Sequence, residues 1–182
     1  MSAYDQIQPI PTTYRGTNFR SRLEARWAVF MDTAGVEWVY EPKLYDLGNG
    51  TRYLPDFWVP GLKAHIEVKP PHVPREAWEK TWLLSSLTQL PVYVLHGCDD
   101  EVVFQSSPFA EQATAVFPNF QDEHYMWCSC PHCGRVDMQF GGRADRISCS
   151  CPKSRHGDKG YNYESSKLAA AYENAVRHRF TL

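Results

Sequence analysis

The chain has 182 residues, of which 43% are hydrophobic and 14% aromatic, and its formal net charge is −2. This composition excludes a disordered chain, and the length suits one domain with a sizeable core plus an appendage. No apolar run approaches the roughly 20 residues of a membrane span, and the polar N-terminus does not look like a signal peptide. We therefore expect a cytoplasmic protein without a membrane partner.

Charge and cysteine are unevenly distributed along the chain. Residues 1–125 hold 10 Lys and Arg against 16 Asp and Glu, a net charge of −6, whereas residues 126–182 hold 9 against 5, a net charge of +4. Five of the six cysteines lie in the second segment. This asymmetry predicts two modules with these bounds, of which the second is suited to a polyanion.

The first predicted element is a helix. Residues 1–17 are expected to be an irregular lead-in, and apolar residues then recur at helical spacing across residues 19–34. Asn18 is placed to cap this helix, and Gly35 is placed to end it.

Strands and further helices follow. Turn signals separate three strand-like segments, at residues 36–42, 51–59 and 64–69. After these we expect a helix at residues 75–89, strands at 91–97 and 101–105, a connection of low pattern at 106–125 and a last helix at 165–180. This order predicts an α/β core with a mixed sheet flanked by helices, followed by a small module and a C-terminal helix.

Two acids and a lysine lie on paired strand-like segments in RYLPDFWVPGLKAHIEVKPP, residues 52–71. A hairpin places Asp56 near Glu67, and Lys69 projects from the same strand face as Glu67. Buried carboxylates are costly unless a cation compensates them, and hard oxygen ligands suit Mg²⁺. Such a trio is what metal-assisted phosphodiester cleavage requires. A chance scatter of charges, with Lys69 paired to Glu67, is the alternative.

The order of motifs around this trio resembles a known family. PD at residues 55–56, followed by EVK at 67–69, resembles the signature of the PD-(D/E)XK nuclease superfamily. The segment FRSRLEARWAVFMDTAGVEWVYEP, residues 19–42, is similar to the N-terminal region of TnsA-like transposon endonucleases and related phage nucleases. In that group a helix with S-x-x-E supplies a further acidic ligand. The resemblance covers about residues 15–105.

The resemblance implies a restriction-endonuclease-like core that cleaves DNA with Mg²⁺ or Mn²⁺. The residues that it implies as metal ligands are Glu24, Asp56, Glu67 and the carbonyl of Val68. Lys69 would be the catalytic lysine, and Arg22 would orient Glu24 or contact phosphate. Taken alone, Glu24 would rather be interpreted as a salt-bridge partner of Arg20 or as a solvent-exposed residue.

The segment WCSCPHCGRVDMQFGGRADRISCSC, residues 127–151, spaces cysteines as metal ligands. One tight turn can present the two sulfurs of C-x-x-C to a tetrahedral zinc ion, and a second hairpin can supply the other pair. The predicted ligands of this structural zinc site are Cys130, Cys133, Cys149 and Cys151. Three other residues can each replace one of these ligands, namely Cys128, His132 and His156.

This zinc-ribbon-like segment contains several basic residues, among them Arg143 and Arg146. Phosphate contacts from such side chains supply most of the non-specific affinity for nucleic acid, so the module is expected to assist DNA binding. The alternative is an adaptor that keeps the nuclease fold, in which the ribbon recruits a partner protein or a second copy of the chain.

Overall fold

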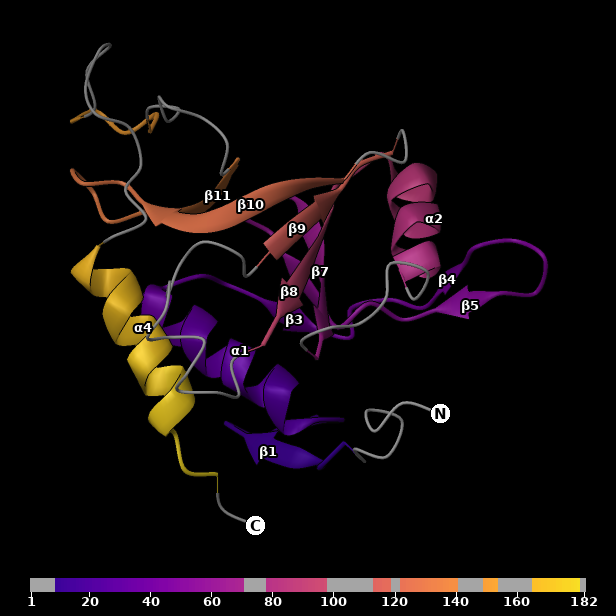
Figure 1. Ribbon diagram of the computed structural model, residues 1–182, viewed down its shortest axis with the longest axis horizontal. Coiled ribbons are helices and arrows are strands. Elements are labelled where there is room, and N and C mark those ends of the chain that lie inside the picture. Colours follow the sequence, from indigo (N-terminus) through magenta and orange to yellow (C-terminus); the bar gives the residue numbers. More distant parts are fainter. Residues whose placement is uncertain are drawn as a thin grey trace.

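The structure is a computed structural model that describes residues 9–70, 78–97, 113–118, 122–140, 149–153 and 165–180. In this part of the chain the central element is a seven-stranded mixed sheet. Helices α1 (Arg22–Ala34) and α4 (Ser166–Arg177) lie on one face of it, and α2 (Glu79–Thr88) lies on the other (Figure 1). The expected α/β core with a mixed sheet is confirmed.

From edge to edge, the strands of this sheet are β11 (Val136–Phe140), β10 (Asp122–Ser129), β9 (Ala113–Val116), β8 (Val92–His96), β7 (Ala64–Lys69), β6 (Phe57–Val59) and β3 (Val39–Tyr40). β7 and β8 run parallel, and the other neighbouring pairs are antiparallel. A parallel pair needs a crossover connection, and α2 lies in the one between β7 and β8.

Helix α1 begins and ends at capping residues. The Ser21 side chain accepts a hydrogen bond from the backbone N–H of Glu24, and Gly35 ends the helix in the left-handed conformation with φ +69°. The prediction that Gly35 ends the helix is confirmed, but the prediction that Asn18 caps it is wrong, because Ser21 is the cap. Asn18 instead lies in the second strand of a hairpin, β1 (Thr12–Tyr14) and β2 (Thr17–Phe19).

Several predicted boundaries differ from the structure. The lead-in contains the β1–β2 hairpin, whose turn residues Arg15 and Gly16 both have positive φ, as a tight two-residue hairpin turn requires. The strand predicted at 51–59 is interrupted at Pro55, which has no N–H for a ladder. Its parts are β5 (Arg52–Tyr53), which pairs with β4 (Tyr45–Asp46), and β6.

Residues 106–125 contain more regular structure than their pattern indicates. β9 lies in this segment, and β10 begins in it. Their small residues, such as Ala113 and Ala115, are fully buried beneath the helices, so close packing rather than large apolar side chains makes this region part of the core. The strand predicted at residues 101–105 lies outside the described residues.

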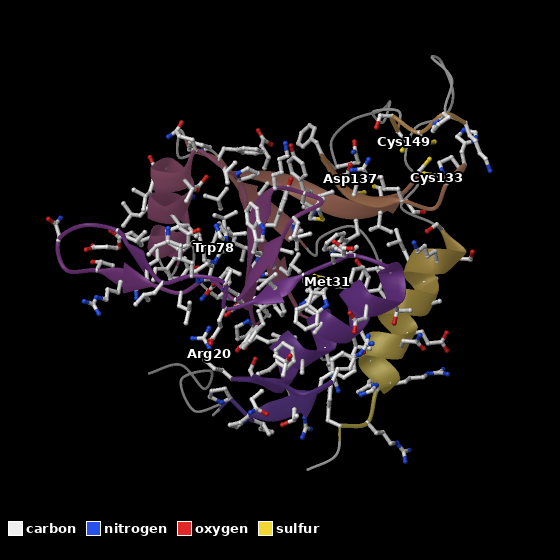
Figure 2. All side chains as sticks on the ribbon, turned by 180° about the vertical axis from the view of Figure 1, so that it is seen from behind. Arg20, Met31, Trp78, Cys133, Asp137 and Cys149 are labelled. Atoms are coloured by element: carbon white, nitrogen blue, oxygen red, sulfur yellow. The ribbon has the colours of Figure 1, made fainter. Side chains whose placement is uncertain are left out.

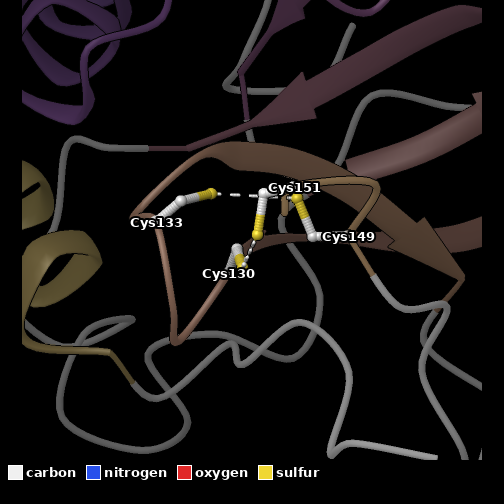
Figure 3. A group of neighbouring side chains, drawn as sticks. All are labelled: Cys130, Cys133, Cys149 and Cys151. Atoms are coloured by element: carbon white, nitrogen blue, oxygen red, sulfur yellow. Dashed lines mark hydrogen bonds between the residues drawn. The ribbon is translucent and has the colours of Figure 1, made fainter. Parts of the chain in front are cut away.

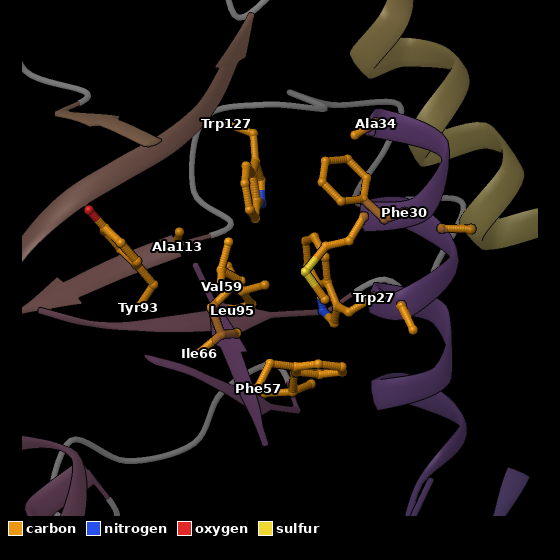
Figure 4. Packing of buried hydrophobic residues seen from close by; sticks show 14 of the residues in the cluster. Trp27, Phe30, Ala34, Phe57, Val59, Ile66, Tyr93, Leu95, Ala113 and Trp127 are labelled. Carbon is orange, nitrogen blue, oxygen red and sulfur yellow. The ribbon is translucent and has the colours of Figure 1, made fainter. Parts of the chain in front are cut away.

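Both segments of the chain contribute to the same hydrophobic core. Trp27 and Phe30 of α1 pack over the sheet, and Trp127 of β10 joins them (Figure 4). The ring of Phe30 lies 5.3 Å from that of Trp127 and 4.5 Å from that of Tyr172 in α4, centroid to centroid. The boundary expected between residues 125 and 126 falls inside β10, so the two expected modules are joined by one sheet and one core.

The alternation of side chains along β7 separates core from site. Ala64, Ile66 and Val68 face the core under α1, whereas Glu67 and Lys69 project from the opposite face, as predicted. Within the described residues, none of the helices has the length and apolar character needed to cross a membrane.

Candidate functional site

The four residues predicted to be catalytic lie in one network. Hydrogen bonds link Glu24 to Asp56 through Tyr40 and Arg20. Glu67 and Lys69 bond each other and are joined to Asp56 through the backbone of Val68. Glu24 lies in the first turn of α1, Asp56 directly precedes β6, and Glu67 and Lys69 lie at the end of β7. All three carboxylates are buried, and Asp56 is only 3% exposed. Three elements that are distant in sequence thus place acidic side chains together beside the core.

Two hydroxyl groups hold the carboxylate of Glu24. Ser21 donates to Oε1 at 2.7 Å, and Tyr40 of β3 donates to Oε2 at 2.6 Å. The Ser21 hydroxyl oxygen also accepts the N–H of Glu24, so one hydroxyl group both caps the start of α1 and binds the Glu24 carboxylate. The S-x-x-E motif therefore fixes the direction of this carboxylate.

Asp56 is held by one backbone group and one side chain. The N–H of Val68 donates to Oδ2 at 2.7 Å, and the guanidinium of Arg20 donates to Oδ1 at 2.6 Å. Burial raises the pKa of Asp56 well above its usual value, and the negative charges of Glu67 and Glu24 raise it further. Together these effects on the pKa of Asp56 are larger than the lowering effect of the Arg20 charge and of the Val68 hydrogen bond.

Glu67 accepts hydrogen bonds from Tyr53 at 2.5 Å and from Lys69 at 2.6 Å. Burial and the charge of Glu67 raise the pKa of the Tyr53 hydroxyl, so Tyr53 stays a hydrogen-bond donor. Lys69 keeps 25% of its side chain exposed and can reach a substrate from the edge of the site. The Lys69–Glu67 pair considered as the alternative is therefore present within the cluster.

Two other predicted residues lie beside this network. The N–H of Val68 points toward Asp56, and in a strand the carbonyl of the same residue leaves on the same side, so the Val68 carbonyl is directed toward the carboxylates. Arg22 is half-buried in the first turn of α1, next to the Ser21 cap.

The donor set fits a hard divalent cation in kind. It consists of buried carboxylates from three elements with a carbonyl beside them, and burial together with the charges of Glu67 and Glu24 raises the pKa of Asp56. Among the described residues, the group whose ligand atoms all lie within 4.8 Å of one another is made of cysteines.

That group contains the four predicted zinc ligands, Cys130, Cys133, Cys149 and Cys151 (Figure 3). The sulfurs of Cys130 and Cys151 lie 3.9 Å apart, and those of Cys133 and Cys149 lie 3.8 Å apart. Four sulfurs around a tetrahedral zinc ion, each at 2.3 Å from the metal, are separated by about 3.8 Å. The cluster can therefore hold a metal ion, and its spacing is consistent with zinc.

The turn after β10 is built to present the first sulfur pair. The N–H of Gly134 donates to the Cys130 carbonyl at 2.9 Å, and the N–H of Cys130 donates to the carbonyl of Arg135 at 2.8 Å. The backbone N–H of His132 points at the Cys130 sulfur, 3.4 Å away. Gly134 has φ +71°, which a residue with a side chain rarely adopts.

The thiols also favour a cation electrostatically. A hydrogen bond from the backbone of Arg135 lowers the pKa of Cys133, but desolvation and the three neighbouring thiols raise it, to about 11. Several thiolates repel one another unless a cation lies between them. Metal binding and deprotonation of the cluster are therefore coupled.

The alternative zinc ligands have different positions. Cys128 is buried and points to the carbonyl of Met126, at 3.7 Å, and it is not one of the four grouped sulfurs. The imidazole of His132 is not part of that group either. His156, Arg143 and Arg146 lie outside the described residues.

Lys167 of α4 connects the cysteine turn with the end of α1, and nothing in the sequence pattern singled it out. Its Nζ donates to the Gly134 carbonyl at 2.7 Å, and a Cβ placed on Gly35 would lie 3.5 Å from the same Nζ. The last turn of α1 has no basic residue of its own. The ammonium group thus lies between a helix C-terminus, which favours positive charge, and the four-cysteine turn, whose thiolates would favour it too when a metal ion is bound.

We expect Lys167→Met to weaken zinc binding about tenfold, because it removes an outer-shell charge and hydrogen bond while keeping most of the side-chain volume. Competition against a chromophoric chelator measures the zinc affinity. Lys153→Met is the matched control, since Lys153 is exposed near Cys151 and loses the same charge. Equal affinities of the two variants would contradict a specific role for Lys167.

The sequence did not identify Tyr40 as a partner of Glu24, and it suggested Glu24 rather than Asp56 as the partner of Arg20. Only the folded positions of these side chains reveal what they contact. Comparison of the chain with protein-family models, curated proteins and solved structures gave no significant match.

Proposed function

We propose that the protein is a metal-dependent DNA nuclease with a restriction-endonuclease-like core. The observation that carries this proposal is the buried network of Glu24, Asp56, Glu67 and Lys69 at the ends of α1, β6 and β7. The order of elements supports it as well: a helix, three antiparallel strands, a crossover helix and a parallel strand agree with the core that the PD and EVK motifs imply.

In this proposal Glu24, Asp56 and Glu67, with the Val68 carbonyl, hold a Mg²⁺ or Mn²⁺ ion. Such an ion polarises the phosphodiester and makes a bound water more acidic. Lys69 positions the attacking water or offsets charge that develops on the phosphate. Ser21, Tyr40 and Tyr53 keep the carboxylates in place through the hydrogen bonds described above.

The cysteine cluster has a structural role in the proposal. Four protein ligands leave no position for substrate on a zinc ion, so the ion would stabilise the turn after β10 rather than take part in cleavage. The net charge of +4 in residues 126–182 supports a role of this segment in DNA capture, through residues that include Arg143 and Arg146.

A cleavage assay tests the proposal directly. Zinc-loaded protein is incubated with linear, nicked, branched and single-stranded DNA, and with RNA, in Mg²⁺, Mn²⁺, Ca²⁺ or EDTA. We expect cleavage of at least one DNA substrate in Mg²⁺ and Mn²⁺, less in Ca²⁺ and none in EDTA.

Lack of cleavage under all these conditions would contradict the nuclease assignment. If the protein then still bound DNA or a partner protein, the adaptor interpretation would replace it. In that case the Lys69–Glu67 and Arg20–Asp56 pairs would be structural ion pairs.

A further inference from the structure

Arg20 is the cation paired with Asp56, the most buried of the three acids, and its own side chain is exposed. Its guanidinium donates to Asp56 Oδ1 at 2.6 Å and to Glu41 Oε1 at 2.8 Å, yet 55% of the side chain is exposed (Figure 2). Arg20 lies between β2 and α1, one residue before the Ser21 cap. The side chain can therefore move without any change in a helix or strand.

The backbone of Arg20 is tied to the same site. Its N–H donates to the Tyr40 hydroxyl at 3.0 Å, and that hydroxyl donates to Glu24. Arg20 thus connects the Glu24 and Asp56 carboxylates, the first through its backbone and the second through its side chain. The backbone hydrogen bond to Tyr40 keeps the Cα of Arg20 beside the carboxylates even when the guanidinium changes partner.

The two oxygens of Asp56 are not equivalent. Oδ2 accepts the backbone N–H of Val68, which belongs to the central sheet and cannot leave without disrupting β7. Oδ1 accepts the side chain of Arg20, which is free to turn toward solvent. A divalent cation that binds Asp56 through Oδ1 competes there with the positive charge of Arg20.

We infer that Arg20 is an internal counter-ion, which holds Asp56 in the metal-free protein and is released to a DNA phosphate when a divalent cation takes its place. The inference rests on the proposed function for its second half. The planar guanidinium fork matches a phosphate as well as a carboxylate, so Arg20 exchanges one oxyanion for another.

Two readouts with opposite expected signs test this inference. For Arg20→Gln, we expect Mn²⁺ to bind about tenfold more tightly, because a charge-assisted hydrogen bond of about 1.5 kcal/mol no longer competes. Cleavage at saturating Mn²⁺ is expected to be slower, because the phosphate contact is lost. Calorimetry on zinc-loaded protein without DNA measures Mn²⁺ binding, and the cleavage assay measures the rate.

Arg15→Gln is the matched control. Arg15 is also an exposed arginine paired with an aspartate, Asp32, at 2.8 Å, but its partner is not one of the acids of the network. The Arg15→Gln substitution should leave both the Mn²⁺ affinity and the cleavage rate unchanged. Arg20→Lys keeps a charge that can pair with Asp56 and should restore wild-type Mn²⁺ affinity in part, which a merely misfolded Arg20→Gln would not explain.

Mn²⁺ affinity that is unchanged or weaker in Arg20→Gln would overturn the inference. It would also be overturned if Asp56→Asn bound Mn²⁺ as tightly as the wild-type protein does. Tighter Mn²⁺ binding without cleavage by any form of the protein would refute the proposed nuclease function but support Arg20 as the counter-ion of Asp56. Tighter binding together with slower cleavage would support both.

Discussion

Lys69→Ala and Glu67→Gln are each expected to reduce DNA cleavage on the order of 10³-fold or more, with little loss of DNA binding. The ammonium group of Lys69, on β7, contacts the buried carboxylate of Glu67, and 25% of the Lys69 side chain is exposed at the edge of the site. Its loss removes the group that positions water or offsets charge on the phosphate. Single-turnover cleavage at saturating Mg²⁺ measures the effect on the chemical step.

Lys80→Ala is a suitable control for this experiment. Lys80 lies exposed on α2 and takes no part in the hydrogen bonds described for the carboxylates, so its removal changes the net charge equally but leaves those hydrogen bonds in place. Thermal unfolding of each variant separates loss of activity from loss of fold. Cleavage by Lys69→Ala at the rate of wild type would contradict the assignment of the nuclease site.

Loss of the metal from the four cysteines is expected to have the largest effect on stability. Purified protein should contain one zinc ion per chain, and Cys130→Ser or Cys149→Ser should lose it. Structural zinc sites of this type contribute about 10 kcal/mol or more of apparent binding energy in isolated fingers. Here residues 149–153 depend on the metal most, because in the described structure their apolar contacts are confined to a small cluster around Cys128, Cys130 and Met126.

The expected unfolding is local rather than global. β10 and β11 are held by a ladder of their own, and Trp127 anchors β10 in the main core. Chelation should therefore increase amide hydrogen exchange in residues 130–135 and 149–153 while the β10–β11 ladder, α1 and β7 remain protected. Cys128→Ser is the matched control, since this buried thiol lies outside the four-sulfur group. Loss of zinc from Cys128→Ser but not from Cys133→Ser would show that the ligand set is wrong.

The spacing of cysteines in the sequence predicted the four-cysteine site. Two sulfurs on one tight turn are brought together by local geometry, so C-x-x-C predicts half of the site almost independently of the fold. The other half, Cys149 and Cys151, was predicted to pair with it, and the structure brings all four sulfurs within 4.8 Å. What the spacing did not indicate is Lys167, because a cation from α4 reaches the turn only through packing of α4 against α1.

The order of the main elements and the positions of Glu24, Asp56, Glu67 and Lys69 on them follow from the sequence, because hydrophobic period, caps and turns are local properties. Which group compensates each acid is not a local property. Arg20 was considered as a partner of Glu24, four residues away, but it pairs with Asp56, 36 residues away, because the sheet brings the start of β6 beside the start of α1. The single core is likewise a tertiary result: the change in charge at residue 125 indicated two modules, whereas burial of Trp127 and Tyr172 against Phe30 joins them.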